Sequence, residues 1–93
     1  MSELKRAKII INGSVQGVGY RYFVMRLAQS LDIKGYTKNI FSGEVLTEVE
    51  GDSSLIQELI KQLKIGPSHA CVKDCFVEWE EYKNEFKKFE IRY

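Results

Sequence analysis

The fold is decided by residues 7–31, which read AKIIINGSVQGVGYRYFVMRLAQSL. The stretch begins with an apolar run in which Ala7, Ile9 and Ile11 share one parity, and this run predicts a strand over Lys5–Asn12. Ile10 breaks the alternation, which is typical of a strand that is apolar on part of both faces. Three glycines within residues 13–19 then predict a loop.

Apolar residues recur at helical spacing after this loop, which predicts an amphipathic helix. They are Tyr20, Phe23, Val24, Leu27, Ala28 and Leu31. We expect the helix to end near Asp32, with Gly35 as its stop signal. Residues 7–31 therefore predict a strand, a glycine-rich loop and a helix in direct succession.

The middle of the chain predicts two strands and a second helix. The strands are Tyr36–Phe41 and Glu44–Glu50, which Ser42-Gly43 joins as a hairpin turn. The helix begins at Asp52 or Ser53, and Gly66-Pro67 ends it. Its apolar stripe consists of Leu55, Ile56, Leu59, Ile60 and Leu63.

The last third of the chain predicts two more strands. The first runs from Cys71 to Glu81, and its apolar parity changes near Lys73–Asp74, which predicts a β-bulge there. The last strand has Phe89, Ile91 and Tyr93 on one face. The resulting order predicts an α+β fold, a ferredoxin-like βαββαβ sandwich whose antiparallel sheet has two helices on one face. We expect residues 1–93 to form a single domain.

Composition narrows the possible functions. The formal net charge of the 93 residues is +1, which gives no electrostatic reason to expect a nucleic-acid or membrane partner. No apolar run approaches the roughly 18 residues of a membrane span, and no secretory signal is recognisable, so we expect a cytoplasmic protein. Cys71 and Cys75 lie on one predicted strand, roughly 13 Å apart, and are expected to be free thiols.

The segment Gly13–Arg21 has the features of an anion-binding loop. Its glycines let successive backbone N–H groups converge at the start of a helix, where the first turn has unpaired donors and a positive dipole end. Arg21 lies in that first turn, and its guanidinium can bind a phosphate with two hydrogen bonds. The segment is neither a Walker A loop, because no Gly-Lys-Ser/Thr follows, nor a dinucleotide fingerprint, because Tyr22 stands where the third glycine belongs.

Four blocks of the sequence resemble the acylphosphatase family. Gly13–Arg21 resembles its signature G-x-V-Q-G-V-x-[FY]-R, and Gly35–Asn39 with Gly43–Val45 resembles G-[WYF]-x-x-N-x-x-x-G-x-V. Gly66–Val72 is similar to the family's G-P-x-x-A-x-V, and Phe89–Arg92 matches its end. The resemblance covers essentially the whole chain in the right order.

The resemblance implies a hydrolase that cleaves acyl phosphates to carboxylate and inorganic phosphate, without metal or cofactor. It assigns catalysis to Arg21 and Asn39, with Asn39 orienting the attacking water. We expect a monomer, although the exposed edges of such a sheet leave association open. The resemblance assigns phosphate binding to Val15, Gln16, Gly17, Val18, Gly19, Tyr20 and Arg21. Ser14 departs from the family pattern, where a basic residue is common. We expect the side chain of Asn39 to lie about one bridging water from Arg21.

Two other functions are compatible with the predicted fold. RNA-recognition domains share the βαββαβ order, but here the aromatic residues of Gly19–Val24 open a helix instead of lying on a central strand. A non-catalytic domain that binds phosphate or a small molecule is the main alternative. We expect His69 to be an exposed turn residue, and Phe76 and Trp79 to be packing residues instead of a ligand platform.

Overall fold

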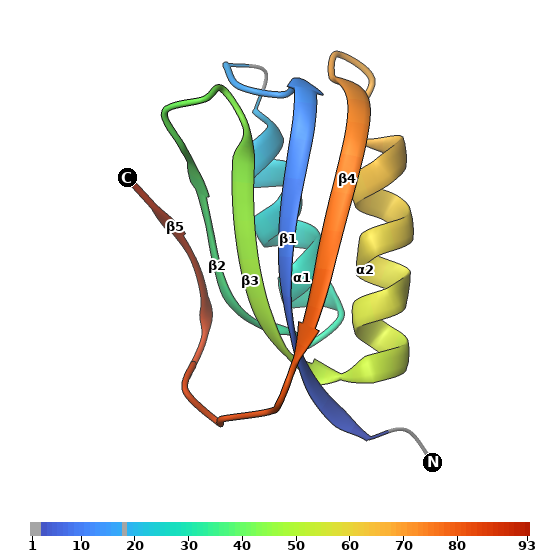
Figure 1. The fold of residues 1–93 in the computed structure, drawn as a ribbon, viewed down its shortest axis with the longest axis vertical. Coiled ribbons are helices and arrows are strands. Elements are labelled where there is room, and N and C mark those ends of the chain that lie inside the picture. Colours follow the sequence, from blue (N-terminus) through green and yellow to red (C-terminus); the bar gives the residue numbers. More distant parts are fainter. Residues whose placement is uncertain (1–2, 18) are drawn as a thin grey trace.

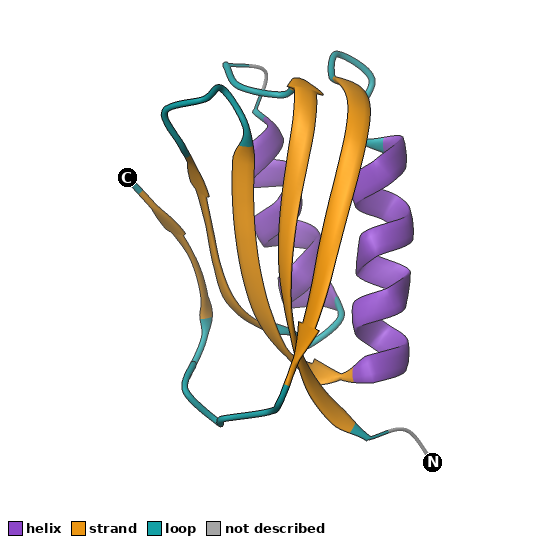
Figure 2. Cartoon of the chain, in the orientation of Figure 1, coloured by secondary structure: helices purple, strands orange, loops and turns teal. Residues whose placement is uncertain are grey.

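The computed structural model describes residues 3–17 and 19–93. Its sheet has the strand order β4-β1-β3-β2-β5, and both helices cover the same face of it (Figures 1 and 2). Neighbouring strands are antiparallel except β2 and β5, which are parallel. The elements are β1 (Leu4–Ser14), α1 (Tyr20–Ser30), β2 (Lys34–Asn39), β3 (Val45–Asp52), α2 (Ser53–Ile65), β4 (Cys71–Glu80) and β5 (Phe89–Arg92). The predicted fold class is confirmed, and β5 extends the sheet at the β2 edge.

The core lies between the sheet and the two helices. Ala7, Ile9 and Ile11 of β1 are fully buried, as their shared parity predicts. The apolar side of α2 covers them, and Ile56 and Leu59 of that helix are also fully buried. Burial of large aliphatic side chains stabilises the fold by about 1.5–3 kcal/mol each, which makes this layer its main source of stability.

The predicted β-bulge is present on β4. Asn12 pairs with Asp74 but Gly13 pairs with Val72, so Lys73 is the extra residue. A Cβ at Gly13 would collide with the carbonyl oxygen of Cys71. The bulge explains the change of apolar parity and requires a glycine where β1 approaches its end.

Different residues begin and end the two helices. Asp52 caps α2 by accepting hydrogen bonds from the N–H groups of Ser54 and Leu55, and Gly66 follows its last residue with φ 70°. The prediction that Gly35 stops α1 is wrong. Asp32 takes the left-handed conformation with φ 54°, whereas Gly35 lies within β2, where a Cβ would collide with the carbonyl oxygen of Glu48.

Two side chains predicted to pack, those of Phe76 and Trp79, are exposed instead. Phe76 is 58% exposed on the helix-free face of the sheet, and Trp79 is 41% exposed near the end of β4. Tyr93 lies beyond the end of β5 and is 97% exposed. Neither helix in the described part of the chain has the length and apolar content that crossing a membrane would require.

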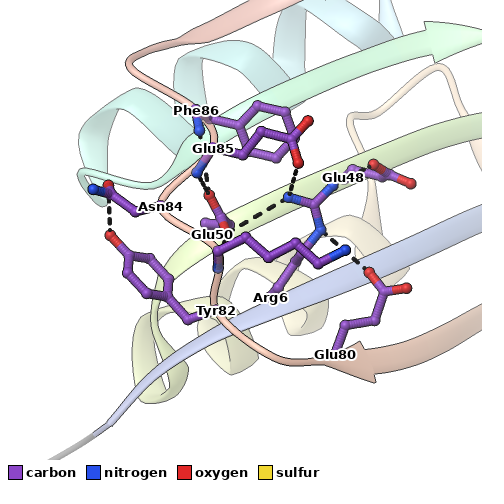
Figure 3. A network of polar contacts seen from close by, with 9 residues as sticks. Arg6, Glu48, Glu50, Glu80, Tyr82, Asn84, Glu85 and Phe86 are labelled. Atoms are coloured by element: carbon purple, nitrogen blue, oxygen red, sulfur yellow. Dashed lines mark hydrogen bonds and ion pairs between the residues drawn. The ribbon is translucent and has the colours of Figure 1, made fainter.

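The connection between β4 and β5 crosses the end of the sheet and is fixed there by one carboxylate (Figures 1 and 3). Glu50 is 3% exposed and accepts hydrogen bonds from the N–H groups of Lys83, Glu85 and Phe86, at 2.6, 2.7 and 3.3 Å. Burial raises the pKa of Glu50, but these three donors and the charge of Arg6 outweigh it, so its pKa lies below the ordinary value.

Arg6 is the buried cation of the same network and is 5% exposed (Figure 3). Its guanidinium lies 3.0 Å from Glu48, 3.3 Å from Glu80 and 3.1 Å from Glu85, and it stacks on the ring of Phe86. The network joins β1, β3, β4 and the crossing connection, so it sets the path by which the chain reaches β5.

We predict that Glu50→Gln lowers the free energy of unfolding at neutral pH by about 2 kcal/mol, because an amide cannot accept from three N–H groups and balance Arg6. Glu50 has a lowered pKa in the folded state, so its contribution is complete above the ordinary value of 4.5. The difference between wild type and variant should shrink as the pH falls below that value. Urea unfolding across acidic to neutral pH measures both effects.

The control for this prediction is Glu78→Gln, which changes an exposed carboxylate of β4. It should alter stability by less than about 0.5 kcal/mol. Equal losses in the two variants, or a Glu50→Gln deficit that does not depend on pH, would contradict the anchoring role of Glu50.

Candidate active site

Three connections meet at one end of the sheet: the loop from β1 to α1, the turn from β2 to β3, and the turn from α2 to β4 (Figure 1). A pocket of about 230 Å³ opens there. It is lined by Val15, Gly17, Gly19, Tyr20, Arg21, Tyr22, Asn39, Ile91 and Tyr93. Arg21 and Asn39, which the sequence predicts to act together, therefore line the same pocket.

The loop between β1 and α1 takes backbone angles that favour glycine. Gly17 has φ 78° and Gly19 has φ 75°, both in the left-handed region. Gly19 is the N-cap of α1, and among the described residues no side chain caps the helix. The N–H groups of the first turn of α1 therefore have no side-chain acceptor at the cap, and the residues of that turn, Tyr20, Arg21 and Tyr22, line the pocket. Val18, also predicted to bind phosphate, lies outside the described residues.

Arg21 contacts the C-terminal end of the chain. Its Nη1 donates a weak hydrogen bond of 3.5 Å to the carbonyl oxygen of Arg92, and its guanidinium carbon lies 4.9 Å from the ring centroid of Tyr93. Ile91 and Tyr93 line the pocket beside it. Sequence reasoning did not place Ile91 and Tyr93 in the same pocket as Arg21, because their position there depends on the parallel pairing of β5 with β2.

Asn39 is the last residue of β2 and pairs with Val45. Val45 is fully buried, so Asn39 lies on the helix-facing side of the sheet. Its Oδ1 is buried, and within the described part of the chain no group donates a hydrogen bond to it. A buried acceptor of this kind is costly unless it is paired, so this oxygen suits a water or ligand donor in the pocket.

Two predicted phosphate-binding residues use their side chains elsewhere. Tyr20 is 1% exposed, its hydroxyl donates to the carbonyl oxygen of Leu63 at 2.7 Å, and burial raises its pKa. Gln16 donates from Nε2 to the carbonyl oxygens of Ile40 and Glu44, both at 3.1 Å. Only their backbone groups remain for an anion. Gln16 ties the loop before α1 to the turn that follows Asn39.

Other residues with chemical potential lie away from this pocket. His69 is exposed in the turn before β4, as predicted, and does not line the pocket. Cys71 and Cys75 are free. Within residues 3–17 and 19–93, no group of three or more His, Cys, Asp or Glu side chains is arranged to hold a metal ion.

Comparison with known proteins gives consistent matches. A family model described as acylphosphatase matches residues 7–91. An acylphosphatase of Chlorobaculum tepidum is 42% identical over 87 residues, covering 94% of this chain and 95% of the relative. One from Thermotoga maritima is 39% identical over 90 residues, covering 97% and 99%.

Solved structures match as well. The crystal structure of acylphosphatase from Bacillus subtilis has a TM-score of 0.92 and 33% identity, covering 98% of this chain and all of that one. Full-length HypF, solved in a phosphate- and nucleotide-bound form, matches over 99% of this chain but only 12% of its own, with a TM-score of 0.89 and 36% identity.

We predict that Gln16→Glu lowers the free energy of unfolding by about 1 kcal/mol, because a carboxylate would face the two carbonyl oxygens that now accept from the amide. Urea unfolding measures the loss. Gln57→Glu, the same change at an exposed position of α2, is the control and should stay within about 0.5 kcal/mol of wild type. Similar stability of the two variants would show that the tie between the loops contributes nothing.

Proposed function

The chain belongs to the acylphosphatase family and is a hydrolase of acyl phosphates, and from this premise we propose how its residues carry out the reaction. Arg21 and the backbone N–H groups of the loop over residues 15–20 hold the phosphoryl group, and Asn39 orients the water that attacks phosphorus. The observation that carries the proposal is that Arg21 and Asn39 line one pocket at the start of α1.

Phosphate binding is proposed to depend on the positive charge of Arg21 and on backbone N–H groups that converge at the start of α1. The guanidinium of Arg21 can give two parallel N–H donors to phosphoryl oxygens. The uncapped first turn of α1 adds N–H groups and the positive end of the helix dipole. The contact of Arg21 with the carbonyl oxygen of Arg92 and the ring of Tyr93 supports this role, because it limits the positions that the guanidinium can take.

Asn39 is proposed to position water and not to act as a base. A side-chain amide is not basic, but its oxygen accepts a hydrogen bond and can fix where a water lies. The buried Oδ1, to which no group in the described part of the chain donates, supports this role. Orientation of a bound water beside a bound phosphoryl group lowers the entropic part of the barrier.

The leaving group makes a general acid unnecessary. Water oxygen forms a bond to phosphorus while the bond from phosphorus to the acyl oxygen breaks, and the carboxylate leaves with the electron pair of that bond. We propose that one water proton moves to a phosphoryl oxygen of the substrate. The remaining demand is stabilisation of charge on the transferring group, which Arg21 and the loop N–H groups are placed to supply.

We propose further that the protein acts as a monomer in the cytoplasm. The proposed chemistry uses Arg21, Asn39 and loop N–H groups of the same chain, so it calls on no residue from a second copy. The free Cys71 and Cys75 suit a reducing compartment. Sedimentation equilibrium at micromolar concentration should give the mass of one chain, and a stable dimer would contradict the proposed monomer.

We predict that Arg21→Ala and Asn39→Ala each lower kcat/KM for benzoyl phosphate by at least about a hundredfold, because each removes a group aimed at the reacting atoms. Asn12→Ala is the matched control, since Asn12 pairs with Asp74 on the opposite side of β1 from Ile11, outside the pocket. It should keep the wild-type kcat/KM. Near-wild-type activity in Asn39→Ala would remove Asn39 from the mechanism.

Inorganic phosphate separates the two proposed roles. Ligand that binds only the folded state raises Tm. Phosphate should therefore raise the Tm of wild type and Asn39→Ala but leave the Tm of Arg21→Ala nearly unchanged. Loss of the shift in Asn39→Ala alone would mean that Asn39 binds phosphate. A folded wild type that binds phosphate but hydrolyses no acyl phosphate would favour the non-catalytic alternative.

A further inference from the structure

We propose that the exposed side of α1 next to the phosphate pocket holds the acyl group of the substrate, and that Arg26 favours acyl groups with a second negative charge at their far end. The proposal rests on the proposed function, because it takes the phosphoryl group to lie beside Arg21. The proposal concerns which acyl phosphates the protein prefers. Arg21 and Asn39 are proposed to act at the phosphoryl group, so they do not distinguish one acyl group from another.

A second hollow adjoins the phosphate pocket. Its volume is about 460 Å³, and Gly19, Tyr22, Phe23, Arg26 and Leu27 line it. Gly19 and Tyr22 line both hollows. A substrate whose phosphate lies in the first can therefore place its acyl group over Tyr22 and along α1, without crossing the sheet.

The walls of this hollow suit an apolar group of moderate length. Phe23 and Leu27 are half-buried against the core, so their outer atoms form an apolar floor. Tyr22 is 55% exposed, which leaves one side of its ring open to stack against a flat acyl group. The hollow is shallow, so these contacts favour such groups without excluding others.

Arg26 supplies a charge at the far end of the hollow. It lies one turn beyond Tyr22, a rise of roughly 6 Å along the helix, and its guanidinium carbon is 5.8 Å from the centroid of the Tyr22 ring. No carboxylate in the described part of the chain forms an ion pair with Arg26. The guanidinium is thus available to an anion on the substrate.

The charge of α1 contrasts with that of the whole chain. The sequence of α1 is YRYFVMRLAQS, with Arg21 and Arg26 but no acidic residue, whereas the chain carries a net charge of only +1. Arg21 is proposed to bind the phosphate, and a substrate with a second anionic group would contact both Arg21 and Arg26. Acyl phosphates derived from dicarboxylic acids, in which one carboxyl group is phosphorylated and the other is free, are the class that fits.

The test compares two aromatic substrates of the same shape. 4-Carboxybenzoyl phosphate carries a terminal carboxylate, and 4-carbamoylbenzoyl phosphate carries a neutral amide in its place. The measured quantity is the ratio of kcat/KM for the first substrate to kcat/KM for the second. Differences in enzyme concentration or folded fraction cancel in this ratio.

We predict that Arg26→Gln lowers this ratio about fivefold relative to wild type, because an exposed ion pair contributes at most about that factor. Arg26→Lys keeps the charge and should retain most of the ratio. Lys61→Gln, which removes an exposed positive charge from α2, should leave it unchanged. High salt should lower the wild-type ratio towards that of Arg26→Gln.

The possible outcomes separate this inference from the proposed function. If Arg26→Gln and wild type show the same ratio, the acyl site at Arg26 is wrong while the mechanism stands. If Lys61→Gln lowers the ratio as much, the effect is general electrostatics and the specific site is also wrong. If wild type hydrolyses neither substrate faster than Arg21→Ala does, the proposed function itself fails.

Discussion

The direction of three strands determines where the site can form. β1 and β2 both pair antiparallel with β3, and β5 pairs parallel with β2, so β1, β2 and β5 run the same way. Their C-terminal ends therefore meet at one end of the sheet (Figure 1). The loop before Arg21 follows the first, Asn39 ends the second, and Tyr93 follows the third.

This arrangement depends on a network at the opposite end of the sheet. β5 reaches its place beside β2 only after the chain has crossed from the β4 edge, and Glu50 holds that crossing by accepting from three backbone N–H groups. A buried carboxylate with one buried arginine is a stable arrangement only when both are fully paired. The stability of this network and the position of Tyr93 beside Arg21 are thus linked through the backbone.

The sequence predicted features that local patterns determine. The strand, glycine loop and helix of residues 7–31, the cap at Asp52 and the bulge at Lys73 each follow from spacing or turn chemistry within a few residues. The prediction that Gly35 stops α1 was wrong, because the sequence alone does not distinguish a glycine required by close strand packing from one that ends a helix. The tie from Gln16 to Ile40 and Glu44 and the placement of Tyr93 depend on pairing between distant strands, which periodicity does not encode. Arg21 and Asn39 line one pocket, whereas their separation by a single water and their chemical roles stay predictions.

The central claim is that the loop over residues 15–20 and Arg21 bind the phosphoryl group at the start of α1. The most direct measurement is an NMR titration of the ¹⁵N-labelled protein with inorganic phosphate, following backbone amides and the arginine Nε–H groups. The account predicts saturable shifts concentrated in residues 15–22 and at Nε of Arg21, with smaller ones at Asn39. Shifts centred elsewhere, for example at the start of α2, or no saturable shift in the loop, would contradict it.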